Sequence, residues 1–434
     1  MSEEAQQPIE ITGLSSDGEG IGRLDDGRVA FVEGGVPGDV VELGEIEERK
    51  RFVRAAIARV VTPSADRVEP VCPHVGVCGG CQWQHVRYEA QLDAKRSIVA
   101  NALERIGGFD LGEKAEGEMT VVPSPESYGY RARARWVESE AGLGYRGRGT
   151  RDVHPVDTCP VLVREGEAAL ATRTAKMRAD AESLEAKSTE GRRDAKKGAS
   201  GKQRRRAPRP TEWVVTVGSG GRAIVVRAAA TGGRGGARPE EETVQLEVMG
   251  ETLRIGGDTF VQGNALLWET LAKSVVERCL APVVTGKPNK LVELYCGAGF
   301  FTLPLARAGL SIVAFESDRS ALADLGYNLR QARLDRNVNI VPGRVETRRD
   351  LERRLKEADV VLVDPPRTGL DEQVTKAIIA AAPERVVYLS CNPATLARDL
   401  KRLAEAGYRP GTPTIFDLFP QTPHVETLVE VTLG

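Results

Sequence analysis

Three apolar runs in the last third of the chain each lead into a residue type that carries chemistry. Residues 385–390 and 359–363 are short and rich in Val and Leu, which is typical of fully buried strands. The first is followed by Cys391 and the second by Asp364, and a third run leads into the glycine loop 296–299. Ligands bind at the carboxyl ends of the strands in open α/β sheets. We therefore expect the thiol, the carboxylate and the glycine loop to form one active site.

Strand-like and helix-like segments alternate from about residue 256 to the end of the chain. The expected strands are 290–296, 311–316, 338–341, 359–363 and 385–390, followed by strand-like runs at 412–416 and 425–433. This order predicts an α/β fold with a doubly wound parallel sheet and an antiparallel edge.

The glycine loop has the pattern of a nucleoside site. Gly297 and Gly299 let a ligand approach the backbone closely, and the next strand ends in Glu316, where an acid hydrogen-bonds ribose hydroxyls in such folds. The loop lacks the full glycine set of a dinucleotide pattern and the lysine of a phosphate loop. S-adenosylmethionine, which has a ribose and no phosphate, fits this pattern; the alternative is a merely tight turn.

Short strand-like runs separated by glycine-rich turns fill the chain up to residue 62. The runs are 8–14, 28–31, 39–46 and 54–61. Such evenly spaced short strands predict a small β-barrel of the oligonucleotide-binding (OB) kind. The basic residues 49–51 and Arg54 form either a positive stripe or a solvated charged hairpin, and the residues alone leave both open.

The seven cysteines are spread unevenly along the 434 residues. Cys72, Cys78 and Cys81 cluster and the others are scattered, which is a poor disulfide framework and favours a metal site plus individual thiols. Cysteine thiolates hold either zinc or an iron–sulfur cluster, and the spacing leaves the metal open. Cys279 and Cys296 are expected to be packing residues.

Charge and composition bound the partners of the chain. The net charge is −2, so any RNA-binding surface must be local. Residues 164–210 are mostly Ala, Lys, Arg, Ser and Glu, which predicts a disordered or partly helical basic insert, either an RNA tether or a solvated loop. The amino terminus lacks the pattern of a signal peptide, and no apolar stretch is long enough to span a bilayer. We expect a cytoplasmic protein that does not bind membranes.

Motifs in a fixed order resemble the RNA uracil-5-methyltransferases, particularly the branch that carries an iron–sulfur cluster and acts on large-subunit (23S) ribosomal RNA. The motifs cover nearly the whole chain: Cys72-x5-Cys78-x2-Cys81 with the distant Cys159, and segments 260–264, 293–299, 364–370, 390–393 and 424–426. The resemblance implies a TRAM-like barrel (1–62), a central β-rich domain with the cysteines and the insert (63–255), and a Rossmann-like class I methyltransferase domain (256–434).

Residue matches to this family imply the roles of single side chains. Cys391 is the implied nucleophile and Glu426 the implied base. A [4Fe–4S] cluster, with zinc as the lesser alternative, is implied on Cys72, Cys78, Cys81 and Cys159. S-adenosylmethionine is the implied methyl donor, held by Gln262, Tyr295, Gly297, Gly299, Glu316 and Asp364.

Two positions depart from the family pattern. Phe300 stands where ribosomal RNA enzymes of the family often have Asn, and after residues 342–344 no acid occurs before Glu346. Both departures concern contacts to adenosine rather than the reaction.

The chemistry explains why a thiol and a carboxylate are needed. Uracil C5 is a poor nucleophile, and attack of a thiolate on C6 makes C5 carbanion-like. After methyl transfer, a carboxylate removes the C5 proton so that the thiol can leave. A paired or stacked uridine must flip out to reach Cys391. Two alternatives stay open: transfer RNA as the substrate, and a non-catalytic RNA-binding protein on a methyltransferase scaffold. We expect a monomer.

Overall fold

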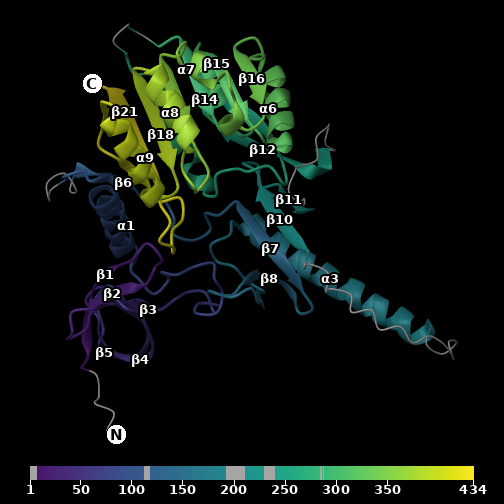
Figure 1. Ribbon diagram of the computed structural model, residues 1–434. Helices are drawn as coiled ribbons and strands as arrows, with labels where there is room; N and C mark the ends of the chain where they lie inside the picture. The colour runs from purple at the N-terminus through teal and green to yellow at the C-terminus, as the bar shows by residue number, and fades with distance from the viewer. Residues whose placement is uncertain (1–6, 112–117, 192–210, 229–239, 284–285, 287) are drawn as a thin grey trace, which may run out of the picture.

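The computed structural model describes residues 7–111, 118–191, 211–228, 240–283, 286 and 288–434. A small barrel, a central β-rich region and a large α/β domain follow one another along the chain (Figure 1). Within these ranges, no helix is both long and apolar enough to cross a membrane.

Five short strands close the N-terminal barrel in the order β1-β2-β3-β5-β4. They are β1 (Ile9–Leu14), β2 (Gly20–Arg23), β3 (Val29–Glu33), β4 (Val40–Glu48) and β5 (Phe52–Thr62). The glycines of β2 predict a turn at this position, where the structure has a strand. A side chain at Gly20 would come within 2.9 Å of both the Gly35 backbone and Ile11, so the close packing of this barrel requires glycine inside a strand.

Acidic residues neutralise much of the positive charge on the barrel. Arg54 lies 3.1 Å from Glu19 and 3.5 Å from Asp17, and Arg49 pairs with Glu47. The exposed hairpin therefore carries paired charges at these positions rather than an uninterrupted positive stripe.

The central region contains a five-stranded antiparallel sheet and a long projecting helix (Figure 1). In the order β11-β10-β7-β8-β9, the strands are β11 (Ala223–Arg227), β10 (Glu212–Val217), β7 (Arg133–Ser139), β8 (Gly142–Arg146) and β9 (Val153–Pro155). Helix α3 (Arg164–Gly191) starts against this sheet, where Leu170 is fully buried and the Arg173 guanidinium lies 3.6 Å from the centre of the Trp213 ring. The insert expected as disordered or partly helical is thus helical over 164–191, because its first turns find apolar partners; residues 192–210 lie outside the described residues.

A nine-stranded sheet forms the α/β domain, in the order β16-β15-β14-β17-β18-β21-β20-β6, with β19 beside β21. The parallel strands are β14 (Lys290–Leu294), β15 (Ser311–Glu316), β16 (Val338–Pro342), β17 (Val360–Val363) and β18 (Arg385–Ser390). The edge adds β21 (Glu426–Leu433), β20 (Thr414–Phe416), β19 (Tyr408–Pro410) and, from the preceding region, β6 (Thr120–Val122). β21 runs antiparallel to β18, as predicted.

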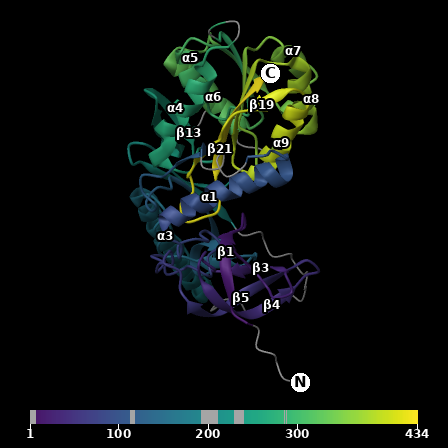
Figure 2. The ribbon, with the colours of Figure 1, turned by 90° about the vertical axis from the view of Figure 1, so that its left-hand side faces the viewer.

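Helices cover both faces of this sheet (Figure 2). One face carries α4 (Trp268–Leu280), α5 (Thr302–Arg307) and α6 (Arg319–Ala332); the other carries α7 (Leu351–Leu355), α8 (Glu372–Ala381) and α9 (Pro393–Glu405). A hairpin, β12 (Thr243–Val248) and β13 (Glu251–Gly256), precedes α4 and packs on α6. The buried Cys279 and Cys296 belong to the core on the first face, as expected for packing residues.

Helix α1 (Tyr88–Ala102) lies between the barrel and the α/β domain (Figure 2). Its Ile98 packs in a cluster with Leu14 of the barrel, whereas the neighbouring Val99 belongs to the core that contains Leu396 and Leu400 of α9. One helix therefore joins the two bodies through different sides of its surface.

Candidate active site

Cys391 and Glu426 follow from the pairing of two neighbouring strands. Ser390, the last residue of β18, pairs with Thr427 of β21 in antiparallel register. Continued by one residue beyond β18, this register would set Cys391 opposite Glu426, and the charge of Glu426 acts on the Cys391 thiol. Directly opposite residues in antiparallel strands have Cβ atoms about 4.5–5.5 Å apart. The fold thus brings together the two residues that the sequence analysis names as nucleophile and base.

Asp364 lies at the same edge of the sheet. It follows Val363 of β17, which pairs with Tyr388 of β18. Gln262, from the loop that follows β13, donates a hydrogen bond from Nε2 to Asp364 Oδ2 at 3.4 Å. A residue that is 102 positions away in the sequence therefore reaches the carboxylate.

Burial raises the pKa of all three groups, and repulsion by neighbouring carboxylates adds to the rise at Cys391 and Glu426. Burial first, and then the charges of Glu426 and Asp364, raise the pKa of Cys391 to about 11. Burial raises the pKa of Asp364 to about 7, and burial followed by the charge of Asp364 raises the pKa of Glu426 well above its usual range. Before a substrate binds, the Cys391 thiol therefore holds its proton at neutral pH.

One oxygen of Glu426 is available to a substrate. The side chain is only 3% exposed, and among the described residues its Oε1 has no hydrogen-bond partner. Buried polar atoms are nearly always paired in native structures. The orphan oxygen therefore indicates a site whose partner is a bound molecule.

A guanidinium acts on the same groups from the loop that follows β17. The positive charge of Arg367 opposes the rise in the pKa of both Cys391 and Glu426. Its Nη2 lies 3.1 Å from Nδ1 of His424, whose pKa is lowered to about 4, first by burial and then by Arg367. Asn392 donates a hydrogen bond from Nδ2 to the Arg367 carbonyl at 3.1 Å, so the arginine loop is tied to the cysteine loop. The sequence analysis assigns no role to Arg367, although it stands inside the quoted motif 364–370.

The turn after β14 has the backbone of a ligand cradle. Tyr295 has φ +66°, a region that residues other than glycine rarely adopt and that recurs at functional sites. Gly297 has φ +56° with open space beside it, whereas a side chain at Gly299 (φ +99°) would lie 2.6 Å from Leu303. The Gly297 N–H donates a hydrogen bond to Glu316 at 2.9 Å. This bond holds the carboxylate that is expected to bind the ribose beside the glycine loop.

Two further contacts concern the positions that depart from the family pattern. The Tyr295 hydroxyl donates to Glu346 at 3.3 Å, so the fold places this acid beside a predicted cofactor residue. Phe300 packs edge-on against the buried Phe301, with ring centres 5.1 Å apart. Sequence spacing gives no signal for the Glu346 contact, since it depends on how the turn after β16 folds back.

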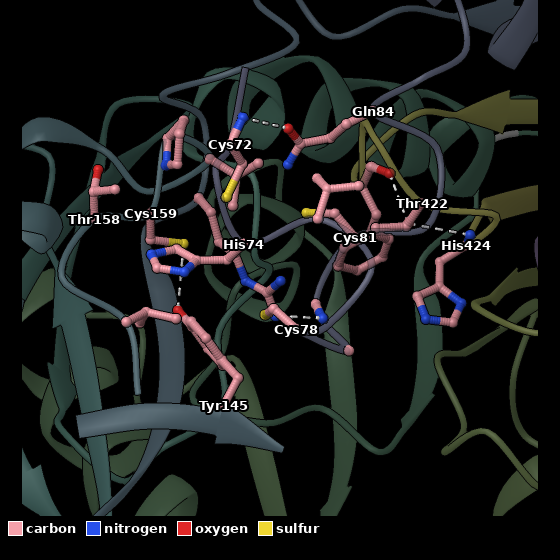
Figure 3. Close-up of a pocket in the computed structure, with 18 of the residues that line it drawn as sticks. Cys72, His74, Cys78, Cys81, Gln84, Tyr145, Thr158, Cys159, Thr422 and His424 are labelled. Atoms are coloured by element: carbon pink, nitrogen blue, oxygen red, sulfur yellow. Dashed lines mark hydrogen bonds between the residues drawn. The ribbon is translucent and has the colours of Figure 1, made fainter. Parts of the chain in front are cut away.

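The four cysteines named as ligands line one cavity of about 370 Å³ (Figure 3). They are Cys72, Cys78, Cys81 and Cys159. All seven cysteines lie within the described ranges and are free. Arg131, Arg367 and His424 line the same cavity, which therefore extends from the thiols to the edge of the catalytic site. Burial is the main cause that raises the pKa of Cys81 to about 12 and that of Cys159 above its usual range.

The side chains around this cavity are engaged with one another. Among the described residues, no group of three or more His, Cys, Asp or Glu side chains is arranged to hold a metal ion. The Tyr145 hydroxyl lies 3.6 Å from Cys159 Sγ (Figure 3), and a backbone N–H donates to Cys78 Sγ at 3.4 Å. His74 contacts Asp157 at 2.9 Å, so its Nε2 is directed to a carboxylate rather than to a sulfur.

Known families and proteins match this chain over nearly its whole length. The family model described as tRNA (Uracil-5-)-methyltransferase matches residues 240–432, and the TRAM domain model matches residues 4–57. The chain is 31% identical to the 23S rRNA (uracil(1939)-C(5))-methyltransferase RlmD of Edwardsiella ictaluri, over 97% of this chain and 94% of the relative. It is 32% identical to the enzyme of the same name from Halomonas elongata, over 98% and 89%. An uncharacterized RNA methyltransferase of Gloeobacter violaceus is 35% identical, over 96% and 94%.

A solved structure shares the fold. The tRNA (uracil-54, C5)-methyltransferase of Pyrococcus abyssi, in complex with S-adenosyl-L-homocysteine, aligns with a TM-score of 0.70 and 23% identity, over 98% of this chain and 100% of that chain. The predicted fold, a class I methyltransferase domain preceded by a small TRAM barrel, is confirmed. By its identity to curated enzymes over nearly their full length, this chain belongs to the family of S-adenosylmethionine-dependent RNA (uracil-5-)-methyltransferases.

Proposed function

We propose that this enzyme methylates C5 of a uridine in 23S ribosomal RNA through a covalent bond between Cys391 and C6. The observation that supports the proposal is that Cys391 and Glu426 lie at the paired ends of β18 and β21, at the edge where Asp364 follows β17. The relatives from Edwardsiella ictaluri and Halomonas elongata, both named for 23S rRNA, favour ribosomal over transfer RNA.

The residues divide the reaction between them. The Cys391 thiolate attacks C6, and the Arg367 charge favours the ionised sulfur. S-adenosylmethionine supplies the methyl group to C5. Glu426 then takes the C5 proton, which restores the C5–C6 double bond as the C6–sulfur bond breaks. Since burial makes Glu426 a stronger base than a free carboxylate, it suits the removal of a proton from carbon.

The turn after β14 fits the methyl donor. The open space beside Gly297 admits a ligand to the backbone, and Glu316 accepts hydrogen bonds at the adjacent strand end. We assign Gln262, Tyr295, Gly297, Gly299, Glu316 and Asp364 to the cofactor side of the site.

We further propose that the four cavity cysteines hold a [4Fe–4S] cluster, with zinc as the lesser alternative. All four thiols line one cavity, and the guanidinium of Arg131, which lines it too, would offset the charge of four thiolates. The bound cluster would join segment 72–81 to Cys159 and stabilise the central region. The chemistry at Cys391 needs no electron, so we assign the cluster no catalytic step.

The substrate assignment is tested with labelled methyl donor. The purified protein is incubated with transcripts of 23S rRNA and of tRNA, and the position of 5-methyluridine is mapped by mass spectrometry after nuclease digestion. We expect label in the 23S transcript and none with Cys391→Ala. Label confined to tRNA would replace the proposed substrate, and RNA binding without any transfer would favour the non-catalytic alternative. We also propose that the protein is a monomer, and the RNA substrate favours a cytoplasmic location.

The cluster is tested by analysis of protein purified without oxygen. We expect iron and sulfide in the wild type, their loss in Cys159→Ser, and their retention in the control Cys279→Ser, because Cys279 is buried in the catalytic core. Zinc without iron in the wild type would exclude the iron–sulfur proposal.

A further inference from the structure

A buried ion pair joins helix α1 to the catalytic domain. Lys95 and Asp417 are both fully buried, and their side chains contact each other across 322 residues of sequence. Lys95 Nζ also donates to the carbonyl of Phe419 at 3.0 Å. Charged groups are rarely buried unless they are paired, because each must be removed from water.

Asp417 has further partners on both oxygens. Its Oδ2 accepts a hydrogen bond from the Tyr88 hydroxyl at 2.8 Å, and its Oδ1 lies 3.3 Å from the backbone N–H of Phe419. The Tyr88 hydroxyl in turn accepts from the backbone N–H of Ser124 at 2.8 Å. The carboxylate is therefore fixed from α1, from its own loop and from the chain that leads out of β6.

This carboxylate stands beside the proposed base in the sheet. Asp417 directly follows Phe416, and Phe416 is the residue that pairs with Glu426 across β20 and β21. The loop 417–425 joins β20 to β21. Lys95 therefore binds this hairpin at its loop end, where Glu426 begins β21. The positive charge of Lys95 also contributes to the lowered pKa of His424, which stands two residues before Glu426. The charge of Lys95 therefore acts on the segment that leads into Glu426.

A second contact from the same helix holds the other part of the loop. Gln91 Nε2 donates to Gln421 Oε1 at 3.0 Å, and the Gln421 N–H donates to Gln91 Oε1 at 2.9 Å. Gln421 has φ +67°, a strained backbone that persists only where its surroundings fix it. Helix α1 thus fixes the loop at two points, one turn of helix apart.

We propose that Lys95 is a positioning residue for the removal of the C5 proton. Through Asp417, Lys95 fixes the β20–β21 hairpin and so holds the Glu426 carboxylate at the position from which it takes that proton. The inference rests on the proposed role of Glu426. A merely stabilising contact would be served as well by apolar side chains of similar volume, whereas a charge pair bonded on several sides fixes the position of the loop.

The test compares Lys95→Met with Lys273→Met, a control on α4 whose lysine is exposed and pairs with the exposed Glu277. In Lys95→Met we expect turnover to fall by roughly 100-fold, the size of effect that a small misplacement of a catalytic group produces. We expect the Kd for S-adenosylmethionine to be unchanged, and a covalent protein–RNA adduct to accumulate because proton removal has become slow. The control should match the wild type in all three measurements.

A double variant separates positioning from stability. Lys95→Met leaves a buried carboxylate unpaired, so the protein is expected to lose stability; Lys95→Met combined with Asp417→Asn removes both charges and should restore the melting temperature. We expect the adduct to accumulate in the double variant also. If turnover returns to the wild-type value together with stability, the pair is only structural and the inference fails.

Glu426→Gln distinguishes this failure from that of the proposed function. If Glu426→Gln accumulates the adduct and neither Lys95 variant does, the base is correctly assigned and the positioning role is wrong. If none of these variants accumulates it, the role of Glu426 fails and the inference fails with it.

Discussion

Substitution of Gly299 tests whether the turn after β14 binds the cofactor, and the structure gives the size of the expected loss of stability. Gly299 has φ +99°, and an added Cβ would lie 2.6 Å from Leu303 Cδ1 and 2.7 Å from Leu325 Cδ1. Both leucines are fully buried, so neither can move without disturbing the core. Gly309 provides a matched control, because it has φ +98° and no atom within 4 Å of its added Cβ.

The two substitutions separate backbone strain from steric overlap. A non-glycine residue in such a conformation costs about 1–3 kcal/mol, which should apply to both Gly309→Ala and Gly299→Ala. Overlap in a packed core adds about 1–3 kcal/mol for Gly299→Ala alone. We therefore expect the free energy of unfolding to fall further in Gly299→Ala than in Gly309→Ala, by about 1–3 kcal/mol. We also expect Gly299→Ala to bind S-adenosylmethionine more weakly.

Urea unfolding followed by tryptophan fluorescence measures this difference, and equilibrium dialysis measures the affinity for the cofactor. Equal losses of stability in the two variants would show that the leucines do not confine the turn. Unchanged cofactor affinity in Gly299→Ala would remove this turn from the cofactor site.

Three further outcomes follow from the same structure. Burial raises the pKa of Glu293 to about 8 from 4.5, so the folded state keeps a proton that the unfolded state releases, and stability should fall as pH rises through this interval; Glu293→Gln should reduce that fall in urea unfolding, since Asp364 and Glu426 contribute to it as well, and an unchanged pH dependence would contradict the burial argument. Adduct formation should speed up with pH over roughly pH 6–9, because the thiol of Cys391 is largely protonated there; Arg367→Met should slow it at every pH in that range, and an equal rate would show that the guanidinium does not act on the sulfur. Deletion of residues 192–210, which lie outside the described residues and are rich in Lys and Arg, should spare methyl transfer to a short RNA and weaken binding of long RNA most at low salt; an unchanged salt dependence would support the solvated-loop alternative.

The edge of the sheet that carries the chemistry could be predicted from the sequence. The apolar runs before Asp364 and Cys391 have the length and composition of buried parallel strands, and the topology of such sheets brings their ends together. The position of Glu426 followed only from the family motif, because an isolated run at 425–433 does not reveal which strand it pairs with.

Other features depend on long-range packing that local sequence does not encode. The glycines of β2 are needed by the barrel wall that surrounds them, although glycine by itself indicates a turn. Helix α3 forms in a segment with few apolar residues because Leu170 and Arg173 meet the central sheet. Lys95 is on an otherwise ordinary helix, and only the fold shows that Asp417 is its partner.

Trapping the covalent intermediate tests most directly whether Cys391 attacks C6 of the uracil ring and Glu426 completes the reaction. Glu426→Gln is mixed with RNA and S-adenosylmethionine, and the products are separated on a denaturing gel. We expect a slowly migrating protein–RNA band that requires the methyl donor and is absent in the double variant Glu426→Gln with Cys391→Ala. Normal turnover by Glu426→Gln, or a band that persists without Cys391, would contradict these two roles.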